Sequence, residues 1–267
     1  MLLLGFSPTA FTWGPDGHAI IADIAERRLD DQSRLWIRDI LGEESLAYAA
    51  NWPDVMRSNP NTFWQKTSKP WHYVTVPDGS SYAQVGAPPQ GDALTALARF
   101  RKTLLDTSSS REQKALAFRF SLHIIADLHQ PMHVGNGKDR GGNKVKLSFD
   151  GKRSNLHSLW DSGLIRFYER RSPGWSQDVK TQISDGHVSA WQSIHPLDWV
   201  TESQELRGRV YPTSRSPDTN YANRQETAVR WRLQQAGLRS AAWINELLRS
   251  PGAQEPQPGY DALESDE

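Results

Sequence analysis

The chain has 267 residues, enough for one large domain or at most two small ones. Lysine plus arginine equals aspartate plus glutamate at 31 each, so the formal net charge is zero, which argues against a protein that coats nucleic acid through its phosphates. The absence of cysteine excludes disulfides, thiolate zinc sites and cysteine nucleophiles.

The first twelve residues, MLLLGFSPTAFT, form a short apolar run that ends in small residues. This pattern is typical of the end of a secretory signal, although a basic segment and an Ala-x-Ala cleavage site are missing. We interpret residues 1–12 as a truncated signal-like segment and expect a secreted or periplasmic protein; a disordered N-terminus is the alternative. No stretch of the sequence is long and apolar enough to span a bilayer.

Apolar residues at helical spacing predict that most of the chain is α-helical. The predicted helices cover about 18–41 with a break near 30–33, about 92–106 with Asp92 as N-cap, and about 111–129, 155–169, 178–192 and 224–249. The aromatic, Pro-rich region 51–91 is expected to be ordered but irregular, and residues 141–151 alternate in the manner of a β-hairpin. The sequence therefore predicts a single, mainly α domain with a short β-hairpin over residues 13–249, followed by a disordered tail over 250–267.

The segment SLHIIADLHQPMHVG, residues 121–135, places polar side chains in an apolar helix. His123 and Asp127 are four residues apart, so they share one helix face and can hold one ion. Pro131 ends the helix, and His133 follows it on a turn. Because buried polar groups are costly unless something compensates them, we favour a metal site here.

The segment NLHSLWD repeats this spacing, with His157 and Asp161 also four residues apart. One such pair arises by chance on many surface helices. Two pairs with a third histidine between them favour metal binding over coincidence.

Two other polar residues lie in the aromatic region, Asp54 in NWPD and His72 in PWHY. Taken separately, they are typical of a turn aspartate and a packed histidine. Together they supply a carboxylate and an imidazole, the ligands that zinc takes when thiolates are absent.

The segment WGPDGH holds one further candidate pair, Trp13 and His18. If the chain is cleaved before Trp13, the free amine and the carbonyl of this residue can chelate an ion, with His18 closing over it. An equally tenable alternative is a plain helix entry in which Asp16 caps the helix and His18 is exposed.

This set of residues resembles the zinc-dependent S1/P1 nuclease family, with the similarity running from Trp13 to about Leu248. The residues that carry the resemblance by order and approximate spacing are Trp13, His18, Asp54, His72, His123, Asp127, His133, His157 and Asp161. The resemblance implies a mainly α fold, shared with zinc phospholipases C, that holds three zinc ions.

The resemblance also assigns the ligands of each ion. The first zinc would be bound by Asp54, His72, His123 and Asp127. The second would be bound by His133, His157 and Asp161. The third would be bound by Trp13 and His18, with Asp127 as a bridge.

Three more residues match positions of the family that act on the substrate. Arg57 matches an arginine that assists at the phosphate, beside Asp54 and Asp127 in the catalytic centre. Tyr73 matches the aromatic residue on which a base stacks, and Asn143 in the GGN loop matches a residue that hydrogen-bonds a base edge. Thr75 departs from the aspartate of some members, which affects base preference. His129 is interpreted as a structural residue and not as a ligand.

The activity implied by the resemblance is zinc-dependent endonucleolytic hydrolysis of single-stranded DNA and RNA to 5′-phosphorylated products, together with 3′-nucleotidase activity. Single-stranded nucleic acids and 3′-nucleotides are the expected partners, and a monomer is the expected state. Two alternatives remain: a zinc phospholipase C, which shares the fold but uses Glu where this chain has Asp161, and a non-catalytic binding protein with structural zinc.

Overall fold

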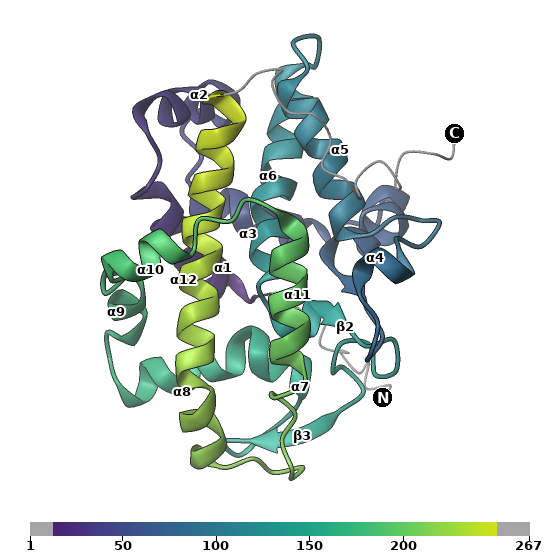
Figure 1. Ribbon diagram of the computed structural model, residues 1–267, viewed down its shortest axis with the longest axis vertical. Helices are drawn as coiled ribbons and strands as arrows, with labels where there is room; N and C mark the ends of the chain where they lie inside the picture. Colours follow the sequence, from purple (N-terminus) through teal and green to yellow (C-terminus); the bar gives the residue numbers. More distant parts are fainter. Residues whose placement is uncertain (1–12, 250–267) are drawn as a thin grey trace, which may run out of the picture.

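Residues 13–249, the part of the chain that the computed structural model describes, are mainly α-helical, as predicted (Figure 1). The α-helices are α1 (Pro15–Glu26), α2 (Asp31–Leu41), α3 (Leu46–Met56), α4 (Tyr82–Val85), α5 (Ala93–Leu105), α6 (Arg111–Leu128), α7 (Leu156–Ser158), α8 (Leu164–Arg171), α9 (Trp175–Thr181), α10 (Asp185–Ala190), α11 (Pro196–Arg207) and α12 (Thr219–Arg249). Two 3₁₀ segments (Lys69–His72 and Pro131–His133) and two π-helical segments (Phe63–Thr67 and Leu159–Gly163) lie between them.

The strands are short and form two pairs. Strand β1 (Val74–Thr75) pairs in parallel with β2 (Val134–Gly135), so the segments that follow His72 and His133 run side by side. Strands β3 (Lys146–Phe149) and β4 (Lys152–Asn155) form the antiparallel hairpin at one end of the molecule (Figure 1).

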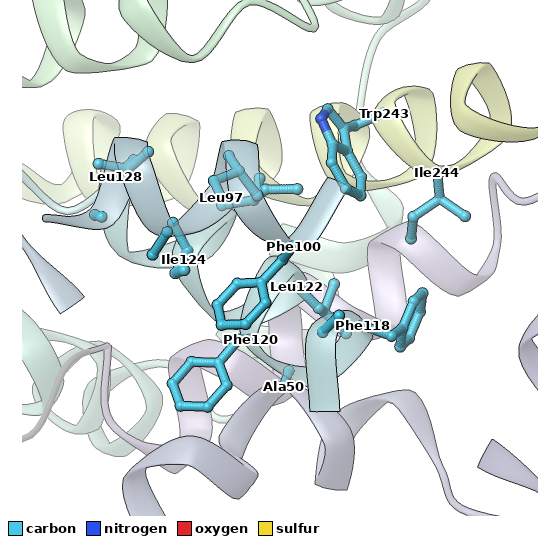
Figure 2. Close-up of a cluster of buried hydrophobic side chains, with 14 of the residues drawn as sticks. Ala50, Leu97, Phe100, Phe118, Phe120, Leu122, Ile124, Leu128, Trp243 and Ile244 are labelled. Carbon is cyan, nitrogen blue, oxygen red and sulfur yellow. The ribbon is translucent and has the colours of Figure 1, made fainter. Parts of the chain in front are cut away.

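Helix α6 is the central helix of the fold. Ser110 caps its N-terminus by accepting a hydrogen bond from the backbone N–H of Gln113, and every residue from 120 to 128 is buried. Figure 2 shows its apolar side chains packed among those of α3, α5 and α12. The Phe100 and Phe120 rings stack at 5.2 Å. This packing holds the backbone of α6 rigidly where it carries polar residues.

Helix α1 lies against the long helix α12 at unusually close range. A Cβ atom on Gly237 of α12 would lie 2.5 Å from the Cβ of Ile24, so only glycine permits this approach. The close packing buries α1 so deeply that His18 is fully inaccessible to solvent. The alternative in which His18 is an exposed residue at a plain helix entry is therefore wrong.

Several predicted bounds are wrong. The hairpin spans 146–155 and not 141–151, because its turn is at Asp150–Gly151, where both residues have positive φ. Helix α3 occupies the start of the region expected to be irregular, with Pro53 inside it. The helix expected over 155–169 is interrupted by the π-helical segment, and that over 178–192 divides into α9 and α10. Helix α11 was not predicted.

Two predictions concern the N-caps of helices, one of which is confirmed and one of which is wrong. Asp92 is the N-cap of α5, as predicted, and accepts hydrogen bonds from the N–H groups of Leu94 and Thr95. The N-cap of α1 is Gly14, with Asp16 in the first turn and not at the cap.

The signal-like segment 1–12 and the predicted tail 250–267 lie outside the described residues. Within 13–249, none of the helices combines the length and apolar character needed to cross a membrane.

Candidate metal centre

Eight histidine and aspartate side chains converge between α1, α3 and α6 and the segments that follow them. They form three groups in which one ligand atom from each residue lies within 4.8 Å of the others. The groups are His18 with His123 and Asp127, Asp54 with His72 and His123, and His133 with His157 and Asp161. Each of these side chains is buried. His123 belongs to the first two groups and joins them, and the third group adjoins them because His133 Nδ1 lies 3.6 Å from Asp127 Oδ2.

Backbone carbonyl groups fix the orientation of three of the imidazole rings. The Nδ1–H of His123 donates to Ala50 O at 2.7 Å, that of His133 to His72 O at 2.5 Å, and that of His157 to Gly141 O at 2.7 Å. When the ring is neutral, Nδ1 carries the proton, so Nε2 is left with a lone pair. These lone pairs are directed into the cluster, as metal-ligating histidines require.

The carboxylate of Asp127 lies at the centre of the cluster. Its Oδ2 is 3.0 Å from His123 Nε2, 3.5 Å from His72 Nδ1 and 3.6 Å from His133 Nδ1, and its Oδ1 is 3.6 Å from His18 Nε2. The carboxylate has no exposed surface. An acceptor-only group among so many imidazoles is suited to bridging two cations.

The Nε2 of His133 and the Oδ2 of Asp161 are among the buried polar atoms of the cluster that have no hydrogen-bond partner within residues 13–249. Leaving such atoms unsatisfied costs about 1–3 kcal/mol each. A cation placed between them would satisfy both atoms at once. The donor set of imidazole nitrogens and carboxylate oxygens also matches the preference of zinc, so the residues fit the metal.

Burial shifts the pKa of the ligand groups in the metal-free protein. It lowers the pKa of His18, His72 and His133 well below the usual value and that of His157 to about 4, so these rings are neutral at physiological pH. Burial also raises the pKa of both carboxyl groups, that of Asp127 to about 7 and that of Asp161 well above the usual value. A cation would offset the cost of ionising these carboxylates.

The GGN loop at 141–143 supports the cluster through its backbone. Gly141 has φ of 58°, and a Cβ atom there would lie 2.2 Å from Met132 O. Only glycine therefore permits the approach that brings its carbonyl to His157. Asn143 lies beyond the two glycines, half-buried, and its Nδ2 donates to Arg140 O at 2.9 Å.

Gln130 is a fully buried residue that sequence analysis did not select. Its Nε2 donates to Asp161 Oδ1 at 2.5 Å, and its Oε1 accepts from the Met132 N–H at 2.5 Å. The amide thus holds one carboxylate oxygen of Asp161 and leaves Oδ2 directed at His157, whose Nε2 is 3.4 Å away. The only feature of the sequence that could have indicated its role is its position between the predicted ligands Asp127 and His133.

The N-terminal end of α1 meets the same centre. The N–H of Gly14 donates to the backbone carbonyl of Asp161 at 2.9 Å, and the fully buried ring of Trp13 lies against Gly17. The backbone of Trp13 is thus held beside the residue that carries one of the ligand carboxylates. The predicted ligands of Trp13 are its backbone amine and carbonyl, whereas the three groups described above consist of side chains. The binding of an ion by Trp13 therefore stays a prediction.

The remaining predicted residues border the cluster. Arg57 Nη1 lies 3.2 Å from Asp54 Oδ1, and its side chain is partly exposed. Tyr73 follows His72 in extended backbone, which turns successive side chains to opposite faces, and is 42% exposed. His129 points away from all three groups, because its Nδ1–H donates to Ile125 O and its Nε2 accepts from Arg239.

Comparison with known proteins agrees with this geometry. A sequence model of the S1/P1 nuclease family matches residues 13–249. Curated relatives include nuclease P1 of Penicillium citrinum, 27% identical over 88% of this chain and 97% of its own, and nuclease S1 of Aspergillus oryzae, 24% identical over 93% and 96%. Endonuclease 2 of Arabidopsis thaliana is 26% identical over 92% of this chain and 94% of its own.

Among solved structures, the alpha toxin from Clostridium absonum shares the fold. The superposition covers 92% of this chain and 68% of the toxin, with a TM-score of 0.52 and 14% sequence identity. This likeness concerns the fold alone. The family match extends over all the residues that form the His/Asp cluster. The chain therefore belongs to the S1/P1 nuclease family, a family of hydrolases that act on phosphodiester bonds.

Proposed function

We propose that this protein is a three-zinc endonuclease that hydrolyses single-stranded DNA and RNA to 5′-phosphorylated products and removes phosphate from 3′-nucleotides. The single observation that carries the proposal is the buried cluster of three His/Asp groups, in which backbone carbonyls direct imidazole lone pairs inward. Burial raises the pKa of Asp127 and Asp161 in this cluster, and bound cations would offset the cost of ionising these two carboxyl groups.

The proposed ligands of the three ions follow the groups and the family resemblance. The first ion is assigned to Asp54, His72, His123 and Asp127, the second to His133, His157 and Asp161, and the third to Trp13, His18 and Asp127. Bound zinc would lower the pKa of a water molecule toward neutrality and offset the charge that develops on the phosphate.

The chain itself supplies the groups that position the substrate. The guanidinium of Arg57 is held by Asp54 at the rim of the cluster, where it can donate to a phosphate oxygen. The exposed ring of Tyr73 offers a stacking surface beside His72, and Asn143 offers an amide on the GGN loop. Stacking on Tyr73 requires a base outside a duplex, which favours single strands and is worth roughly 1–3 kcal/mol per base.

The proposal extends to the organisation of the molecule. Residues 13–249 are proposed to form one catalytic domain that acts as a monomer. A secreted or periplasmic location is supported by the apolar, signal-like segment 1–12. Cleavage before Trp13 would free the amine that the third ion requires.

Release of acid-soluble nucleotides from single-stranded RNA tests the proposal, with the full chain and with protein beginning at Trp13. We expect activity that a chelator abolishes and zinc restores, with 5′-phosphates on the products. The Tyr73→Ala variant should raise KM for RNA. The matched control, Tyr48→Ala, removes a 51% exposed tyrosine on α3 and should not change it.

Two outcomes would contradict the proposal. Faster hydrolysis of a short-chain phosphatidylcholine than of RNA would make the protein a phospholipase C. Folded, zinc-loaded protein that hydrolyses neither substrate would favour structural zinc in a binding protein.

A further inference from the structure

A cavity of about 290 Å³ adjoins the metal centre on the side of Asp161. It lies between the β3–β4 hairpin and the face of the π-helical segment and α8, and Asp161 itself lines it. Four cationic side chains also line it, Lys152, Arg153, Arg166 and Arg170. In a chain with a formal net charge of zero, this is a marked local concentration of positive charge.

The cationic face is adjacent to the face that carries metal ligands. Ser158, Ser162, Arg166 and Arg170 recur every four residues, so they share one side of this helical stretch and line the cavity together. His157 and Asp161 precede the two serines by one residue each. Asp161 both lines the cavity and belongs to one of the metal groups, so the cavity opens beside that group.

Few of these cations are neutralised. Arg170 pairs with Asp150, and Arg166 lies 3.8 Å from Asp16 with both side chains more than half exposed, a contact that contributes little. Within residues 13–249, no carboxylate lies within 4.0 Å of Lys152 or Arg153, the two cations of strand β4. The cavity therefore has positive charge available for an anion.

We propose that this cavity binds phosphate groups of the nucleotides that flank the cleaved bond, chiefly through Arg153 and Arg166. The inference rests on the proposed nuclease activity and extends it from the reaction centre to a strand several nucleotides long. Tyr73 borders the group that contains His72, whereas the cavity borders the group that contains Asp161. A bound strand thus contacts the protein beyond the base stacked on Tyr73.

The test uses the zinc-loaded protein and measures kcat/KM for a dinucleotide and for a single-stranded oligonucleotide of about eight nucleotides, over a range of salt concentrations. The variants are Arg153→Gln and the double variant with Arg166→Gln. The control is Arg38→Gln, which removes an exposed arginine on α2, at the end of the molecule far from β3 (Figure 1).

We expect the preference for the oligonucleotide over the dinucleotide to fall about tenfold in the double variant, because two phosphate contacts are lost. The slope of log kcat/KM for the oligonucleotide against log salt should become shallower by about 0.7 for each arginine removed. Arg38→Gln should leave both quantities at the wild-type value.

An unchanged preference and slope in the double variant would overturn the subsite, and so would an equal loss for both substrates. If the zinc-loaded wild type hydrolyses neither substrate, the proposed nuclease activity fails instead. In that case, the affinity for the labelled oligonucleotide is measured by fluorescence anisotropy over a range of salt concentrations, because the oligonucleotide is not hydrolysed. A shallower dependence of this affinity on salt in the arginine variants supports the subsite. Identical salt dependence in the variants and the wild type refutes it.

Discussion

Replacing Asp127 with asparagine should have opposite effects on the metal-free and the zinc-loaded protein. In the metal-free fold, burial raises the pKa of Asp127 from 3.8 to about 7. Between these values the folded state keeps a proton that the unfolded state has lost, so stability falls as pH rises through this window. At about 1.4 kcal/mol per pKa unit, the ionised carboxylate costs the metal-free protein roughly 4 kcal/mol above pH 7.

Asparagine keeps the shape of the side chain but carries no charge. We expect Asp127→Asn to stabilise the metal-free protein at pH 8 by about 1–4 kcal/mol. The gain is at the lower end of this range if the buried amide lacks hydrogen-bond partners, because an unsatisfied amide is itself destabilising. With zinc present the sign reverses, because the variant loses the carboxylate that lies among four imidazoles. It should bind less zinc and hydrolyse RNA far more slowly than wild type.

Thermal unfolding at pH 8, with chelator and with zinc, measures both effects. For a domain of this size, 1 kcal/mol shifts Tm by roughly 2–4 °C. The matched control is Asp92→Asn, because burial also raises the pKa of Asp92 but this residue caps α5 and is in none of the metal groups. Its effect on Tm should be the same in both conditions. If Asp127→Asn keeps full zinc and full rate, the metal cluster is wrong.

Three further changes test the surroundings of the cluster. Gly141→Ala should lower zinc content and Tm, because the added Cβ meets Met132 O and displaces the carbonyl that orients His157; metal analysis and calorimetry measure this. Gln130→Met keeps the volume but removes the hydrogen bond to Asp161, and we expect zinc affinity to fall about 10–100-fold in a chelator competition. The lowered pKa of His157, about 4 against 6.5, means that the stability contributed by this residue to the metal-free protein should fall by roughly 3 kcal/mol as pH falls from 6.5 to 4. Because Asp127 contributes in the opposite direction over this range, the effect is measured as the Tm of His157→Gln relative to wild type, which should rise as pH falls.

The helices that carry most ligands could be predicted because their apolar faces are regular. Helix α6 has an apolar residue at nearly every core position, so His123 and Asp127 stood out as polar exceptions four residues apart. Helix α3 was missed because Pro53 suggests a break, although it is tolerated inside the helix where Asp54 follows it. The alternation over residues 141–151 predicted a hairpin that includes the GGN loop, whereas the two glycines of this loop lie outside the hairpin and allow a close approach to Met132.

Other features of the centre depend on contacts between distant segments. The sharing of His123 between two groups requires α1, α3 and α6 to meet, which no local pattern encodes. The bond from Gln130 to Asp161 joins residues 31 positions apart, and glutamine carries no metal-binding signal of its own. The sequence also did not show that neutral ring tautomers would be fixed by carbonyls of Ala50 and Gly141.

The most direct test of the central claim is a zinc titration of metal-free protein beginning at Trp13, with the release of acid-soluble nucleotides from single-stranded RNA followed at each step. If the His/Asp cluster and Trp13 hold three catalytic ions, activity should rise from zero and saturate at three equivalents of zinc. Full activity in chelator, or folded protein that stays inactive at saturating zinc, would contradict it.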